Sequence, residues 1–150
     1  MTLERFIEKT DELVRGLVKS VDEDYDCEMG SDFCVYLDED LIHWSLLYRD
    51  ECGTAFYNNF IKRFPRAKGF GLFTLSLLHE LGHLETEWDM EDDIAIDADA
   101  LSNEDYFALH NEKIATDWAG EYLITHYDEV FAFDELIEAW LKAMYADVLD

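Results

Sequence analysis

Two histidines and a glutamate in one short segment have the spacing of a metal site. The segment is His79-Glu80-Leu81-Gly82-His83, so the histidines stand four residues apart. On a helix, residues at this spacing project from the same face about one turn apart, and two imidazoles so placed can bind one Zn²⁺. The carboxylate of Glu80 would lie on the adjoining face, where it could take a proton from a water that the metal acidifies. The pattern therefore predicts metal-assisted hydrolysis.

The segment around these residues is the least polar in the chain. Residues 70–86 carry apolar side chains on nearly all sides, which predicts a helix buried in the core. Imidazoles and a carboxylate are costly to bury without partners, so a shared metal ion would explain their presence there. The other interpretation is that both histidines are core residues that are satisfied by hydrogen bonds to carbonyl groups.

A catalytic zinc site needs a third protein ligand and an open position for water. The helix predicted to start at residue 102 offers three candidates, which are His110, Glu112 and Asp117. We favour Glu112, because small residues share its helical face and would let the two helices approach closely; they are Ala108, Ala115, Thr116 and Ala119. His110 lies on a bulkier face. Asp117 could accept a hydrogen bond from the second ring nitrogen of one histidine, or it could be an ordinary solvated acid.

Two motifs in this order resemble those of the ImmA/IrrE-type metallopeptidases. The first is the His79–His83 segment, and the second runs from Glu112 to Ala119 as Glu-Lys-Ile-Ala-Thr-Asp-Trp-Ala. Members of that family are gluzincins of bacteria, phages and mobile elements, with an HExGH motif followed by a Glu-x-x-Ala-x-x-aromatic-Ala helix. The resemblance implies a zincin-like fold, with His79, His83 and Glu112 as zinc ligands and Glu80 as general base. It also implies a protein or regulator as substrate.

Catalysis would need further groups that stabilise charge and position the substrate. A donor must face the developing oxyanion, and Tyr122, His126 and Tyr127 are available; we name His126 as the catalytic candidate, although no spacing selects it. Zincins commonly bind a peptide along an edge strand above the active helix, and residues 41–45 are the candidate edge. An ordinary strand with Trp44 in the core is the alternative.

The chain is strongly acidic, with 36 acidic and 11 basic residues in 150 and a formal net charge of −25. This balance argues against a nucleic-acid partner, because affinity for phosphates rests on Lys and Arg, and against docking on anionic membranes. The basic residues cluster only at 62–68. The acidic surface could serve solubility alone or attract a basic partner, so we expect a protein or peptide substrate of basic character.

The cysteines and the N-terminal residues indicate in which cellular compartment the chain is expected. Cys27, Cys34 and Cys52 form no CxxC pair, so free thiols in a reducing compartment are expected. The first nine residues are charged and lack the apolar core of a signal peptide, and no apolar run approaches the length of a membrane span. A cytoplasmic location is the expectation.

The predicted elements indicate an α+β fold in a single domain over residues 1–150. Helical patterns of apolar residues cover 2–20, 54–64, 70–86, 102–127 and 129–147, and β-branched and aromatic residues predict a hairpin at 33–37 and 41–48. Pro65 should stop the second helix, and Ser102 with Asp105 resembles a capping box. We expect a zincin-like, mostly helical domain with a small antiparallel sheet or hairpin beside the helix of the histidines.

Two functions of different classes are compatible with these patterns. The leading one is a zinc-dependent metallopeptidase in which Glu80 serves as general base. The alternative is a protein-binding module, either an acidic decoy for a basic surface or a zincin without catalysis. A decoy would bind basic proteins in a strongly salt-dependent way, and its affinity would be indifferent to Glu80→Gln.

Overall fold

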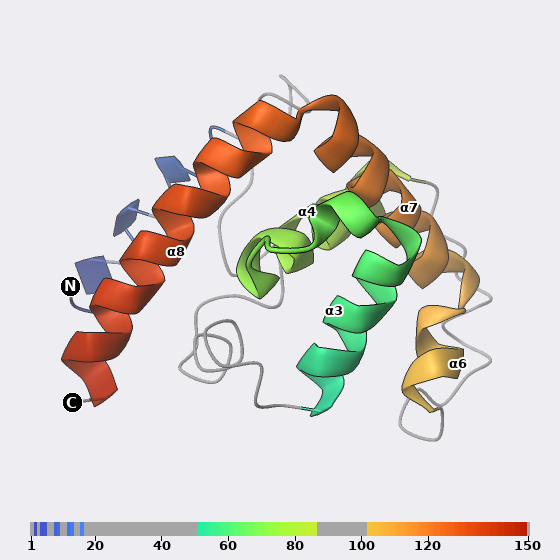
Figure 1. The fold of residues 1–150 in the computed structure, drawn as a ribbon, viewed down its shortest axis with the longest axis horizontal. Coiled ribbons are helices and arrows are strands. Elements are labelled where there is room, and N and C mark those ends of the chain that lie inside the picture. Colours follow the sequence, from blue (N-terminus) through green and yellow to red (C-terminus); the bar gives the residue numbers. More distant parts are fainter. Residues whose placement is uncertain are drawn as a thin grey trace.

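A helix at the centre of the molecule carries residues 79–83. The computed structural model describes residues 51–86 and 102–149, together with 2, 4, 5, 8, 9, 12, 13 and 16. Its elements are α3 (Glu51–Arg63), the 3-10 helix η1 (Pro65–Ala67), α4 (Leu72–Glu85), α6 (Asn103–Phe107), α7 (His110–Thr125) and α8 (Tyr127–Leu149). Figure 1 shows α4 in the middle, with α3, α7 and α8 packed around it.

The fold class predicted from the sequence is wrong for this part of the chain. Every regular element within 51–86 and 102–149 is a helix, so the described fold is mainly helical rather than α+β with a sheet. The physical reason is that α4 buries its apolar surface against other helices, which leaves no need for a sheet there. The predicted hairpin at 33–37 and 41–48, which includes the candidate substrate edge, lies outside the described residues.

The helix predicted over 102–127 is broken in two. Leu109 has a φ of −57° and a ψ of 143°, which is not a helical conformation. The amides of Ala108 and Leu109 donate to carbonyl oxygens three residues earlier, at 3.2 and 3.1 Å, and this tighter pattern closes α6. The predicted start is confirmed, because the Asp105 amide donates to Ser102 Oγ at 3.2 Å.

The core is built around α4 and agrees with the sequence patterns. Every side chain from Leu72 to His79 is buried, as the all-round apolar pattern of this segment predicts. α3 ends at Arg63, just before Pro65, as predicted, and Pro65 is the first residue of η1. The apolar side of α8 is buried through four residues, which are Val130, Phe133, Ile137 and Leu141.

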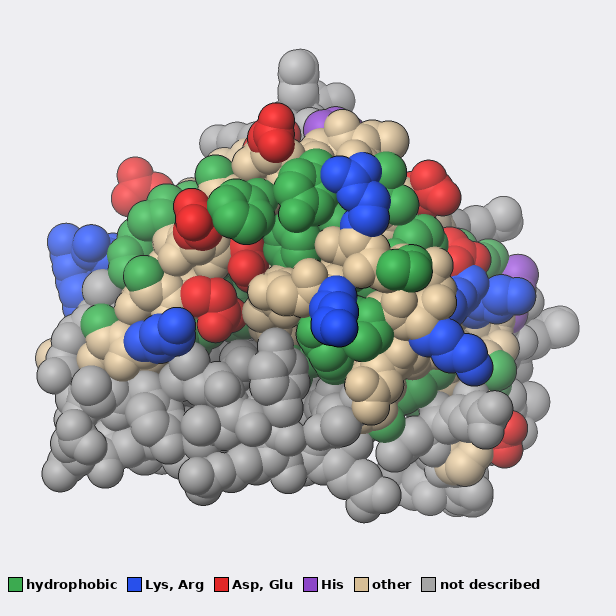
Figure 2. All heavy atoms as spheres, in the orientation of Figure 1, with side chains coloured by type: hydrophobic (Ala, Val, Ile, Leu, Met, Phe, Trp, Pro, Cys, Tyr) green, Lys and Arg blue, Asp and Glu red, His purple; other side chains and the backbone are tan. Residues whose placement is uncertain are grey.

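Two arginines of the basic cluster at 62–68 contact side chains of their own chain. Arg63 forms an ion pair with Asp117, and the guanidinium of Arg66 lies 4.6 Å from the centre of the Tyr127 ring. Figure 2 shows Lys and Arg side chains scattered over this face among hydrophobic and acidic groups, with two of them adjacent on the right. In the part of the chain that the structure describes, no helix combines the length and apolarity needed to cross a membrane.

A carboxylate from α8 holds the N-terminus of α4. Asp134 Oδ1 accepts hydrogen bonds from the Gly71 amide at 3.0 Å and from the Thr74 hydroxyl at 2.5 Å, so negative charge faces the positive end of the helix dipole. Glu138, one turn further along α8, lies against the same end, where a Cβ at Gly71 would stand 1.8 Å from its Oε1. Burial and the neighbouring charge of Asp134 raise the pKa of Glu138 to about 7.

The raised pKa of Glu138 should make the stability of the fold depend on pH. The folded protein holds this proton up to about pH 7, whereas the unfolded chain releases it near the ordinary pKa of 4.5. The free energy of unfolding therefore falls as the pH rises from about 4.5 to about 7. Glu138→Gln should remove this pH-dependent loss and raise the free energy of unfolding by about 1–2 kcal/mol above pH 7, after allowance for the partial exposure of the side chain.

Urea unfolding of the two proteins at about pH 5 and about pH 8 measures this effect. The matched control is Glu135→Gln, which makes the same change at an exposed position of the same helix. If Glu138→Gln and the parent lose equal stability between the two pH values, the raised pKa is refuted.

Candidate metal centre

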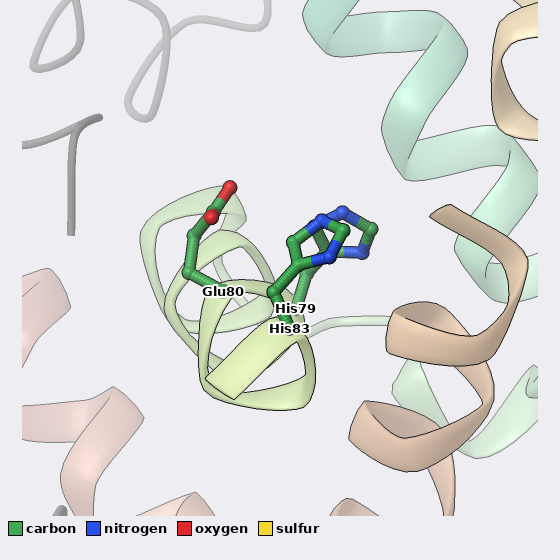
Figure 3. A group of neighbouring side chains, drawn as sticks. All are labelled: His79, Glu80 and His83. Carbon is green, nitrogen blue, oxygen red and sulfur yellow. The ribbon is translucent and has the colours of Figure 1, made fainter. Parts of the chain in front are cut away.

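α4 presents His79, Glu80 and His83 in its last two turns. The centres of the two imidazole rings are 4.7 Å apart, at an interplanar angle of 86°. Figure 3 shows the rings side by side, with the carboxylate of Glu80 projecting from the adjoining face of the helix. One ligand atom from each residue lies within 4.8 Å of the other two, so the three side chains could hold a metal ion.

Glu112, in the first turn of α7, reaches both rings. Its Oε2 lies 2.7 Å from His79 Nε2, and its Oε1 lies 3.4 Å from His83 Nε2. The Glu112 side chain is only 14% exposed, so this carboxylate meets the imidazoles largely away from water. The competing candidate His110 is exposed at the start of α7. The structure thus brings Glu112 to the two histidines, as the sequence argument expects.

The close approach of α4 and α7 depends on small residues. A Cβ at Gly82 would stand 2.4 Å from the backbone oxygen of Ala115 and 2.9 Å from its Cα, so only glycine fits at this contact. On α7, Ala115 and Ala119 are fully buried, and Thr116 is 2% exposed. The small face predicted for the helix of Glu112 is confirmed at these three positions, and Gly82 supplies its counterpart on α4. The fourth predicted member, Ala108, precedes α7 in the break and is exposed.

Thr116, rather than Asp117, is the second partner of His79. The Nδ1 atom of His79 lies 3.0 Å from Thr116 Oγ1, and an Nδ1–H that donates to this oxygen leaves Nε2 as the ligand atom. Asp117 is one residue further, about 100° round the helix, and pairs with Arg63. The rings of Phe56 and His79 pack nearly perpendicular to each other, at 5.5 Å between ring centres, which further fixes the orientation of this imidazole.

The two carboxyl groups of the site have opposite electrostatic environments. Burial by itself would raise the pKa of Glu112, but hydrogen bonds to His79 and His83 lower it to about 2. Burial raises the pKa of Glu80 above its ordinary value, against the effect of the two histidines. Glu112 is therefore the stable anion of the pair, as a ligand must be, and Glu80 has the higher proton affinity, as a general base needs.

No protein-family model, curated protein or solved structure matches this chain. The resemblance to the ImmA/IrrE-type metallopeptidases thus rests on the residues of 79–83 and 112–119 themselves. Membership of that family stays a prediction.

The structure adds Tyr106, which the sequence argument did not assign to the site. Its hydroxyl donates to Glu112 Oε1 at 3.3 Å. On the continuous helix predicted for 102–127, residues six positions apart would be about 120° apart on the helix surface, so Tyr106 would point away from Glu112. The break at Ala108 and Leu109 changes this direction, and neither residue is a Gly or Pro that would have signalled it.

The catalytic candidate His126 lies away from the metal centre. It follows the last residue of α7, 14 positions after Glu112 and thus about 21 Å along the helix at 1.5 Å per residue. Its ring stacks on Tyr122 at 4.1 Å between centres, and its Nδ1 lies 2.9 Å from Thr125 Oγ1. Tyr122 lies in the last turns of α7 and Tyr127 is the first residue of α8, so none of these three candidates stands beside Glu112.

Proposed function

We propose that the chain is a zinc-dependent peptidase that hydrolyses peptide bonds in protein or peptide substrates. The observation that carries this proposal is the position of the Glu112 carboxylate, 2.7 Å from His79 Nε2 and 3.4 Å from His83 Nε2. A purely structural cluster would satisfy the two imidazoles through Glu112 and Thr116. It would give no reason for a second carboxyl group, that of Glu80, to be partly buried beside them.

The donor set fits zinc. Zinc binds imidazole nitrogen and carboxylate oxygen at about 2.0–2.2 Å, and a tetrahedral arrangement spaces such ligand atoms about 3.3 Å apart. Glu112 Oε1 lies 3.4 Å from His83 Nε2, which is close to this spacing, and the other oxygen, Oε2, is the one that faces His79. The distance of 2.7 Å between Glu112 and His79 would lengthen by about 0.6 Å, which small side-chain rotations can supply.

The residues would divide the work of hydrolysis between them. His79, His83 and Glu112 would hold the ion, which supplies a Lewis acid that polarises the peptide carbonyl and acidifies water. Glu80 accepts a proton from the attacking water and delivers it to the leaving amine. Thr116 keeps the His79 ring in the orientation that directs Nε2 to the site.

The charge of the chain supports a basic substrate. A net charge of −25 raises the local concentration of cationic ligands and speeds their encounter with the protein. With the two motifs, this leads us to propose a member of the ImmA/IrrE-type metallopeptidases, of bacterial or phage origin, that cleaves a basic protein or regulator.

Removal and return of zinc tests the proposal. The metal-free protein, prepared with a chelator, should not cleave a fluorescence-quenched library of basic peptides. One equivalent of Zn²⁺ should restore cleavage, and an acidic library should be cleaved more slowly, because its charge opposes that of the protein. Cleavage that survives complete removal of zinc would refute the proposal. So would a zinc-loaded protein that binds basic proteins in a salt-dependent way but hydrolyses neither them nor the peptides, which is the behaviour of a binding module.

A further inference from the structure

Tyr106 reaches the candidate metal centre from a helix that is separate from α4 and α7. Its hydroxyl donates to Glu112 Oε1 at 3.3 Å, and the contact is partly buried. The same oxygen lies 3.4 Å from His83 Nε2, whereas Oε2 faces His79 Nε2 at 2.7 Å. The Tyr106 hydroxyl therefore contacts Oε1 of Glu112, while Oε2 faces His79.

The position of Tyr106 is fixed from both sides. The N-terminal end of α6 is held by Ser102, whose Oγ accepts the Asp105 amide at 3.2 Å and whose carbonyl accepts the Tyr106 amide at 2.9 Å. On the other side, the ring of Phe107 is buried and packs on Phe56 at 6.0 Å between centres. Phe56 in turn contacts the His79 ring, so α6 is connected through Phe56 to one histidine of the candidate centre.

We infer that Tyr106 is a positioning residue, which holds one carboxylate oxygen of Glu112 so that Glu112 is presented correctly to the metal. This inference rests on the proposed zinc site. A carboxylate on a long side chain can rotate, and hydrogen bonds to the groups that ligate a metal typically account for about 10–100-fold in metal affinity or activity. Tyr106 acts through Glu112 and not on the substrate.

Zinc affinity of the Tyr106→Phe variant, measured by competition with a chromophoric chelator, tests the inference. We expect a loss of about tenfold with an unchanged thermal unfolding midpoint of the metal-free protein, and a shifted visible spectrum of the Co²⁺-substituted variant. Tyr127→Phe is the matched control, because it removes the hydroxyl of a tyrosine at the start of α8, beyond the far end of α7, and its zinc affinity should equal that of the parent.

A double-mutant comparison separates a positioning role from general loosening of the structure. In a Glu112→Ala background, Tyr106→Phe should change zinc affinity by less than about twofold, because the group through which it acts is gone. Equal zinc affinity in the parent and in Tyr106→Phe would overturn the positioning role and leave the peptidase proposal intact. Absence of zinc binding by the parent would overturn both, and zinc binding without hydrolysis would overturn the peptidase proposal alone.

Discussion

The Glu80→Gln variant should bind zinc as tightly as the parent and lose about a thousandfold in the rate of peptide hydrolysis. Glutamine has the shape of glutamate but cannot accept the proton of water at neutral pH, and general-base catalysis is typically worth 10²–10⁴-fold. Retention of the metal follows if His79, His83 and Glu112 are the ligands. The measurements are zinc content after dialysis and the hydrolysis rate at saturating peptide.

The variant also decides between two possible roles of Glu80. The carboxylate of Glu80 lies close enough to the two histidines to bind the same metal ion, so Glu80 could itself be the third ligand. In that case Glu80→Gln would lower zinc affinity strongly, because a charged ligand is lost, and the assignment of Glu112 would be wrong. Glu85→Gln makes the same change at an exposed position of α4, and both its zinc content and its hydrolysis should match the parent.

The Gly82→Ala variant should be destabilised by about 3 kcal/mol and should bind zinc poorly. Its Cβ would stand 2.4 Å from the backbone oxygen of Ala115, and backbone cannot move aside as a flexible side chain can, so α4 and α7 must separate. Separation of the two helices carries Glu112 away from His79 and His83. Urea unfolding of the metal-free protein and chelator competition measure the two effects independently.

Two other glycines provide the controls for this variant. Gly16→Ala meets no atom within 4 Å and should leave stability and zinc affinity near those of the parent. Gly120→Ala, on α7, would contact the ring of Phe64 and should lower stability without moving Glu112 from the histidines. If Gly82→Ala loses stability but binds zinc as well as the parent, close contact of α4 with α7 is not what positions Glu112.

The side-chain arrangement of the candidate metal centre could be predicted in part from the sequence, because its residues obey short-range helical geometry. The four-residue spacing of His79 and His83 places both rings on one face of any helix, and the small residues around Glu112 mark the face that can approach a neighbour. Thr116 was assigned to that face as a small residue, but its hydroxyl as the partner of His79 was not foreseen. Side-chain pairing between two helices depends on their relative rotation, which no local pattern specifies.

Tyr106 and His126 show where sequence reasoning fails. Tyr106 was not assigned to the site, and His126 was named although no spacing selects it. The break at Ala108 and Leu109 turns Tyr106 towards Glu112, and the length of α7 removes His126 from the site. Residues 102–112 contain no Gly or Pro that would mark the break or the direction in which α7 passes α4. Both features result from packing rather than from local propensity.

For the fold too, local elements could be predicted from the sequence but their arrangement could not. The helices and their buried sides could be predicted, since the apolar patterns of 70–86 and 129–147 have the helical period. The class could not, because the α+β expectation depended on residues 33–48, and the described helices pack on one another without a sheet. The fold class depends on how the elements pack together, whereas the period of the apolar residues specifies only the individual helices and strands.

The most direct test of the account is a crystal structure of the zinc-loaded protein, with diffraction recorded on both sides of the zinc absorption edge. The account predicts a single anomalous peak bound by Nε2 of His79, Nε2 of His83 and a carboxylate oxygen of Glu112, with one position open to solvent beside Glu80. A peak bound by Glu80 in place of Glu112, or the absence of zinc at the two imidazoles, would contradict it.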